Sequence, residues 1–126
     1  MTAIKSYTDL EQSRKLAEIL PAESANMYYT PPLVKGHTTY IPHLKRRLPI
    51  DLDIEQAIPC WSLAALLDIL PILDNRSPVI SKTFDGTYRV LYHSTAYESA
   101  ILTSDYGNPI DACYEMILKL NELKML

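Results

Sequence analysis

The sequence predicts an α+β protein, and three observations indicate this fold class. Signals for a helix start precede three apolar stretches, near residues 8, 62 and 108. The pair Asp85-Gly86 separates two runs that are rich in β-branched and aromatic residues. Six of the nine prolines lie between residues 21 and 59, where no helical period is sustained. We therefore expect an N-terminal helix, a proline-rich irregular segment, and then a compact unit of helices and antiparallel strands.

The first helix is predicted between residue 8 and Pro21. Thr8 and Glu11 have the spacing of a capping box, in which each side chain satisfies a free backbone N–H at the helix start. Apolar residues follow at helical spacing, and Pro21 ends the helix because proline lacks the N–H that another turn needs. From there to residue 56 the chain is predicted to be irregular or to contain short strands. Only "PIDLDIEQ" (49–56) alternates apolar and acidic residues in the manner of a strand.

Residues 57–126 are predicted to form the compact unit, which begins with a second helix. Ser62 caps a helix that covers Leu63 to Leu70, and Pro71 ends it. Because this helix is apolar nearly all round, we expect it to be buried.

An antiparallel meander follows this helix. The runs "PVISKTF" and "TYRVLYHS" flank Asp85-Gly86, which predicts a hairpin with a type I′ turn. "YESAILTS" (97–104) is the predicted third strand. Tyr88, Val90 and Tyr92 then share one face of the central strand, which leaves the alternate residues on the other face.

A last helix closes the unit. Asn108 is its predicted cap, Pro109 suits the first turn, and Asp111 favours the positive N-terminal end. The helix is expected to run to about Leu123. Its apolar stripe consists of Ile110, Cys113, Ile117 and Leu120.

The predicted order from residue 57 onward is helix, three-stranded antiparallel meander, helix. This arrangement covers one face of a sheet with two helices. It is also the element order of double-stranded-RNA-binding domains, although element order does not determine function. A chain of 126 residues fits one domain, so a single domain over 1–126 is expected.

Composition and charge restrict the classes of function. The formal net charge of −3 and the pI of about 5.5 disfavour nucleic acid and anionic membranes as partners. No apolar run approaches the roughly 18 residues needed to cross a bilayer. The N-terminal residues lack the apolar region of a signal peptide, and two cysteines without metal-type spacing suit a reducing compartment. We expect a cytoplasmic protein.

The two cysteines raise the question of catalysis. Cys60 precedes Trp61 at a helix start, which resembles the nucleophile region of papain-type cysteine proteases. That family has a glycine-rich approach to its cysteine and a more distant histidine, and here only His93 follows. A Cys60–His93 hydrolase is the second alternative, and packing of a small apolar thiol is favoured. Cys113 lies in the apolar stripe of the last helix, so we predict no catalytic residue.

No metal or cofactor is expected. The histidines and cysteines, at His37, His43, His93, Cys60 and Cys113, are not paired at the spacing of a structural zinc site. The acidic "DLDIE" lacks the turn and the final Glu of a calcium loop. The three glycines form neither a phosphate-binding nor a dinucleotide-binding loop.

The basic cluster of the chain follows His43. Lys45, Arg46 and Arg47 are candidates for phosphate contact, which makes a nucleic-acid-binding module the first alternative function. A solvated loop whose charges pair with nearby acidic residues is the other interpretation. RNA-binding domains of this element order have basic residues at the start of the last helix, whereas "NPIDACYE" is acidic here.

Tyrosine is unusually frequent, with nine residues against one Phe and one Trp. Tyrosine combines an apolar body with a polar tip, which suits interfaces as well as half-buried core positions. Both interpretations stay open for these residues. The candidate partner surface consists of Tyr28, Tyr29, Tyr40, Tyr88 and Tyr92.

Two stretches of the compact unit carry a resemblance to known proteins. "IPCWSLAALLDILP" and "NPIDACYEMILKLNELKML" resemble a group of small uncharacterised proteins of gut Bacteroidales and their phages and mobile elements. The shared patterns are Pro-x-Trp-Ser-Leu-x-x-Leu-Leu and Asn-Pro-x-Asp-Ala-Cys-x-Glu-Met, over roughly residues 57–126. The resemblance implies a cytoplasmic accessory protein, and it carries over no catalytic residue. The tyrosines, the lack of a catalytic constellation and the long proline-rich segment favour a non-enzymatic interaction protein, which binds an unknown protein or associates with itself.

Overall fold

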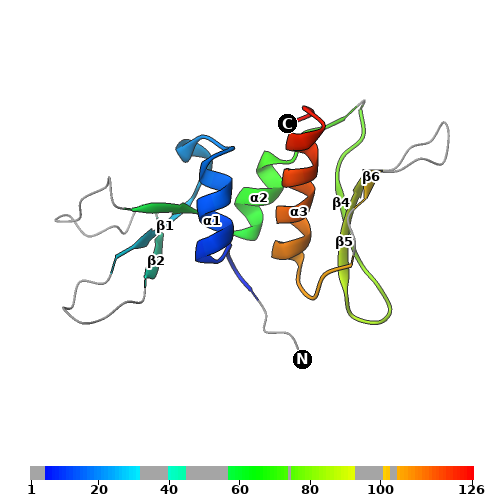
Figure 1. Ribbon diagram of the computed structural model, residues 1–126. Helices are drawn as coiled ribbons and strands as arrows, with labels where there is room; N and C mark the ends of the chain where they lie inside the picture. The colour runs from blue at the N-terminus through cyan, green and yellow to red at the C-terminus, as the bar shows by residue number, and fades with distance from the viewer. Residues whose placement is uncertain (1–4, 32–39, 45–56, 74, 93–100, 103–104) are drawn as a thin grey trace. The chain divides into compact units, whose positions relative to one another are not determined.

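The computed structural model describes residues 5–31, 40–44, 57–73, 75–92, 101–102 and 105–126. The chain divides into two compact units, which are Tyr7–Ala65, here the N-terminal unit, and Met1–Ser6 with Leu66–Leu126, here the C-terminal unit. Each unit contains a three-stranded antiparallel sheet (Figure 1). The α+β class is thereby confirmed. That the two units act as one domain stays a prediction.

Helix α1 (Leu10–Ala17) opens the N-terminal unit. Its cap is Asp9, whose carboxylate accepts from the Gln12 backbone N–H at 2.8 Å, while Gln12 Oε1 accepts from the Asp9 N–H at 3.1 Å. The predicted capping box at Thr8 and Glu11 is therefore wrong by one residue. Aspartate is as good a helix cap as threonine, so Thr8 and the adjacent Asp9 were both suitable for this position. Asp9 is the cap, and the hydroxyl of Thr8 is buried in the interior instead.

Three short strands form the sheet of this unit. β1 (Met27–Thr30) lies between β2 (Ile41–Leu44) and β3 (Ile58–Cys60), and a 3₁₀ turn, η1 (Ala22–Ser24), precedes β1. The segment 21–56 therefore contains short strands, the alternative that the sequence left open, at β1 and at β2. The edge strand β2 contains Pro42, because an edge strand tolerates proline where a central strand does not. The strand predicted at 49–56 lies outside the described residues.

The interior of the N-terminal unit lies between α1 and its sheet, where α1 packs against β3. Trp61 is fully buried, and its indole N–H donates to Ser24 Oγ at 3.0 Å. Polar residues are buried beside apolar ones. The buried residues are Thr8, Ser13, Leu16, Leu20, Ala25, Tyr29, Thr30, Cys60 and Trp61.

Helix α2 (Leu63–Ile69) follows β3 directly. The predicted cap is confirmed, because Ser62 Oγ accepts from the Ala65 N–H at 3.3 Å. The expectation that this helix is buried all round is wrong. Leu66 is fully buried, but Leu67 is 38% exposed, so α2 buries only part of its apolar surface.

The C-terminal unit packs helix α3 (Pro109–Glu122) against the central strand of its sheet. The sheet order is β4 (Val79–Lys82), β5 (Tyr88–Tyr92), β6 (Ile101–Leu102), with antiparallel neighbours. The predicted cap of α3 is confirmed by the bond from the Asp111 N–H to Asn108 Oδ1 at 2.8 Å. The predicted stripe of α3 is also confirmed, since all four of its members are fully buried. The apolar residues buried in this unit are Leu66, Leu70, Val90, Tyr92, Ile110, Ala112, Cys113, Met116, Ile117 and Leu120.

Candidate interaction site

The turn between β4 and β5 departs from the predicted type. The Gly86 N–H donates to the Thr83 carbonyl at 3.0 Å, and the Thr83 N–H donates to the Thr87 carbonyl at 2.8 Å. Gly86 has a φ of 87°, whereas Asp85 keeps a negative φ. The turn is therefore a type I turn closed by a left-handed glycine, the three-residue hairpin loop. The predicted hairpin is confirmed, and its predicted type I′ turn is wrong.

Side chains hold this turn without the help of burial. The Asp85 carboxylate accepts from the hydroxyl of Thr83 and from that of Thr87, the latter at 3.0 Å. The two hydroxyl oxygens lie 2.6 Å apart. The bond from Thr83 and then that from Thr87 lower the pKa of Asp85, since both stabilise the carboxylate. Local hydrogen bonds thus fix the shape of an exposed loop.

Phe84 lies in this turn, directly beyond the end of β4. It is the one phenylalanine of the chain, and its relative exposure of 105% means that the ring touches almost nothing. An aromatic ring on a fixed loop loses little conformational freedom when it binds, and it removes a large apolar area from water. Phe84 therefore has the character of a binding anchor.

Strand β4 is an edge of its sheet, and the hydrogen bonds of β5 show which groups it presents. Tyr88 exchanges both backbone bonds with Tyr106, at 2.7 and 2.8 Å, on the side of β5 away from β4. Because Lys82 is opposite Tyr88, Lys82 forms no ladder bonds with β5, and its own N–H and C=O point outward. The backbone N–H and C=O of Ile80, two residues earlier, point outward as well. Within the described part of the chain, nothing pairs with these four groups.

The sheet of the N-terminal unit has different edges. Pro42 lies in β2 opposite Tyr29, and Pro59 lies in β3 opposite Tyr28. A proline fits an edge strand only with its nitrogen on the open side, so each of these edges lacks a donor there. Proline at an edge opposes the addition of another strand. Strand β4 has no proline between Val79 and Lys82.

Two of the five tyrosines predicted for a partner surface are buried instead. Tyr29 is 7% exposed and donates to the Thr8 carbonyl at 2.8 Å; Tyr92 is 3% exposed and donates to the Pro71 carbonyl at 2.6 Å. Burial raises the pKa of both, that of Tyr92 to about 12. Each ring fills a core while its hydroxyl finds a carbonyl, which is the core interpretation of these tyrosines.

The other three tyrosines are half-buried. The Arg14 guanidinium lies 5.7 Å from the ring centre of Tyr40, and the Lys82 ammonium lies 5.8 Å from that of Tyr88. Tyr28 lies on β1, between the two edge strands. A partner-binding role for Tyr28, Tyr40 and Tyr88 stays a prediction.

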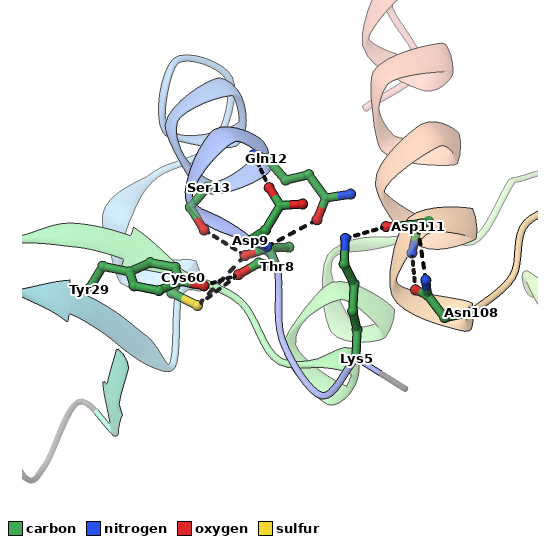
Figure 2. A network of polar contacts seen from close by, with 9 residues as sticks. All are labelled: Lys5, Thr8, Asp9, Gln12, Ser13, Tyr29, Cys60, Asn108 and Asp111. Atoms are coloured by element: carbon green, nitrogen blue, oxygen red, sulfur yellow. Dashed lines mark hydrogen bonds and ion pairs between the residues drawn. The ribbon is translucent and has the colours of Figure 1, made fainter. Parts of the chain in front are cut away.

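Cys60 belongs to a buried polar network of the N-terminal unit, which Figure 2 shows around Thr8. Thr8 Oγ1 lies 2.8 Å from Ser13 Oγ and 3.7 Å from Cys60 Sγ, and the thiol lies 3.5 Å from the Thr8 carbonyl. Burial raises the pKa of Cys60, which disfavours the thiolate that a nucleophile needs. Burial also raises the pKa of Cys113, to about 12. The burial of both thiols favours a packing role for Cys60 and Cys113. The proposed partner of Cys60, His93, lies outside the described residues.

The candidate phosphate contacts, Lys45, Arg46 and Arg47, also lie outside the described residues, as does His37. His43 lies on β2, where its Nε2 is 3.0 Å from Thr30 Oγ1. In the described segments, no three His, Cys, Asp or Glu side chains gather as metal ligands would. Nor does any helix described here have the length and apolar character to cross a membrane.

The start of α3 is acidic, and its charge is already paired. Asp111 accepts from Lys5 Nζ at 2.8 Å through Oδ1 and from Asn108 Nδ2 at 2.8 Å through Oδ2 (Figure 2). A carboxylate at this position repels a phosphate. The helix start where double-stranded-RNA-binding domains are basic is therefore unsuited to that contact here.

Sequence reasoning missed the two features that define the candidate site. Phe84 had a readable signal, because the residue before Asp-Gly in a predicted hairpin lies in the turn and hence at the surface. The open edge of β4 had none, because strand order within a sheet is set by tertiary packing.

The chain was compared with models of protein families, with curated proteins and with solved structures. No family model, curated protein or solved structure matches it. The fold and the candidate site therefore stand on the residues and contacts of this chain alone.

Proposed function

We propose that this chain is a small non-enzymatic protein-interaction protein that binds through its β4–β5 hairpin. The observation that carries the proposal is the fully exposed ring of Phe84 on a hydrogen-bonded turn, at the end of an edge strand with outward backbone groups. Aromatic anchors supply much of the energy of protein interfaces. An open edge strand adds directional hydrogen bonds.

The thiols support a role without catalysis. A cysteine hydrolase needs an accessible thiolate, whereas Cys60 is fully buried and has a raised pKa. Alkylation of native Cys60 by iodoacetamide at neutral pH tests this point. A rate above that of a small model thiol would restore the Cys60–His93 hydrolase as a candidate.

The biological setting rests on the sequence resemblance. The two patterns around Trp61 and Asn108 favour an accessory protein of gut Bacteroidales, of phage or mobile-element origin, that works in the cytoplasm.

Nucleic-acid binding is the second candidate, and one observation favours it. The order α2, β4, β5, β6, α3 is a helix, three antiparallel strands and a helix, which resembles double-stranded-RNA-binding domains. The net charge of −3 and the paired Asp111 oppose it. Affinity for RNA that falls steeply with salt, and falls again in Arg46→Ala, would support this candidate.

Affinity capture tests the proposed function. Tagged wild-type protein and the variants Phe84→Ser and Ile72→Ser are expressed in the native host beside an untagged copy, and the captured proteins are identified with and without nuclease. Ile72 is the matched control, because it is 69% exposed but lies outside the hairpin. We expect a nuclease-resistant protein that Phe84→Ser loses and Ile72→Ser retains. Equal capture by all three proteins, or no capture by a wild type that is also monomeric in solution, contradicts the proposal.

A further inference from the structure

We infer that the occupant of the β4 edge is a second copy of this chain, which pairs β4 with β4 antiparallel about a two-fold axis. The inference rests on the proposed function and names its partner. The two sheets would join into one continuous sheet across the axis. Three properties of the edge make it complementary to itself.

The first property is the position of the outward backbone groups. They belong to Ile80 and Lys82, which flank Ser81 symmetrically. When two such edges meet antiparallel with Ser81 opposite Ser81, each Ile80 exchanges its bonds with Lys82 of the second copy. All four outward groups of each edge are then satisfied. If the register shifts by two residues, either Lys82 comes opposite Pro78 or Ile80 comes opposite Phe84 in the turn, so some of the outward groups lose their partners.

The second property is the position of the apolar side chains. Val79, at the start of β4, is 42% exposed, and Phe84 lies just beyond its other end. In the two-fold register Val79 lies opposite Thr83 of the second copy, and Phe84 of that copy lies opposite Pro78. Each pairing therefore covers two exposed apolar groups, at both ends of the interface.

The third property is the distribution of charge. Lys82 lies opposite Ile80 of the second copy, so the two ammonium groups do not face each other. The positive charges of the two edges are therefore kept apart in this register, so they do not oppose the pairing.

The size of the contact sets its strength. Strand β4 has four residues, and its hairpin adds one aromatic ring. An interface of this size belongs to the class below about 1,200 Å² of buried area, which is typical of weak and transient association. We therefore expect a dimer whose population rises with concentration across the range of about 10 µM to 1 mM.

Sedimentation equilibrium over that range tests the inference. Lys82→Pro removes an outward N–H but no bond to β5, and Phe84→Ala removes the anchor from a position without intramolecular contacts. Each change is expected to weaken the dimer by at least about tenfold, because the two-fold axis doubles each loss. Ile72→Ala, an exposed apolar change outside the hairpin, is expected to leave the dimer unchanged.

The outcomes separate the inference from the proposed function. A wild type that stays monomeric over the whole range overturns the second-copy inference. If that monomer still captures a host protein through Phe84, the proposed function stands. A dimer that withstands Phe84→Ala also overturns the inference, and this variant decides the matter if Lys82→Pro does not fold. A dimer lost in Phe84→Ala and kept in Ile72→Ala supports it.

Discussion

In the N-terminal unit, hydroxyl and thiol groups lie inside the core, and both outer strands of the sheet contain a proline. In the C-terminal unit, α3 covers the sheet with an apolar stripe, and the polar network lies in an exposed turn beside a proline-free edge. The first unit satisfies its polar groups internally and blocks its edges. The second leaves directional groups and one aromatic ring at the surface. This difference indicates that the groups available for binding lie at the surface of the C-terminal unit.

The largest expected contrast is between the two aromatic residues that typify the units. Trp61→Ala should cost about 3–5 kcal/mol of unfolding free energy, because it removes a fully buried indole. Phe84→Ala should change stability by no more than about 0.5 kcal/mol, because its ring has almost no contacts. Urea denaturation followed by circular dichroism measures both. A loss below about 1 kcal/mol for Trp61→Ala would contradict the assignment of Trp61 to the core.

A smaller contrast compares one substitution in the two polar networks. The buried backbone N–H of Trp61 donates to Thr8 Oγ1 at 3.1 Å, and Thr8→Val removes this acceptor. It should cost about 1–3 kcal/mol, since water cannot replace that acceptor. Thr87→Val acts in the exposed turn, where water does replace the lost bond, and should cost within about 0.5 kcal/mol. Equal losses in the two variants would remove the distinction between a buried and an exposed network.

Alkaline pH should weaken the C-terminal unit, through groups that burial keeps protonated. The folded pKa of Tyr92 and that of Cys113 are each raised to about 12, from ordinary values of 10.0 and 9.0. A raised folded pKa gives stability that is full below the ordinary value and lost as the pH rises through the folded one. We expect the urea midpoint to fall between about pH 9 and 12. Tyr92→Phe should flatten the upper part of this decline, and an unchanged profile in that variant contradicts the assignment.

The smallest expected effect is an acid response of the exposed turn. The folded pKa of Asp85 is lowered by the hydroxyl bonds from Thr83 and Thr87. Its contribution is therefore present above the ordinary value of 3.8 and lost as the pH falls through the lower folded value. The protection of the Gly86 and Thr87 amides, measured relative to their intrinsic exchange rates, should fall over that window, while the protection in α3 should not. Asp85→Asn should remove this pH dependence of the protection.

Much of the C-terminal unit could be predicted from the sequence because its signals are local. Asn108 with Pro109 marks the start of α3, the spacing of Ile110, Cys113 and Ile117 marks its buried face, and Asp-Gly marks the hairpin. Each signal acts within a few residues, where propensity and periodicity are informative.

The misses have a different origin, since each depends on a competitor or on a distant partner. Thr8 and Asp9 both fit a helix cap, and only the interior around Cys60 shows why Thr8 is used there. Pro42 and Pro59 suggested irregular chain, because their tolerance depends on an edge position that sequence does not reveal. The open edge of β4 was missed for the same reason, because neighbours far along the chain decide which strand lies at an edge. The exposure of Phe84, in contrast, had a local signal in its place before Asp85-Gly86.

The most direct test of the contrast between the units is residue-resolved amide hydrogen exchange at two protein concentrations, one below and one above the expected dimerisation range. The account predicts that exchange at Ile80 and Lys82 slows at the higher concentration. Exchange at Ser81, whose N–H bonds to β5, should stay the same, as should exchange at Leu44, whose N–H lies on the open side of the edge strand β2. Unchanged rates at Ile80 and Lys82, or slowing at the proline-bearing edge instead, would contradict the account.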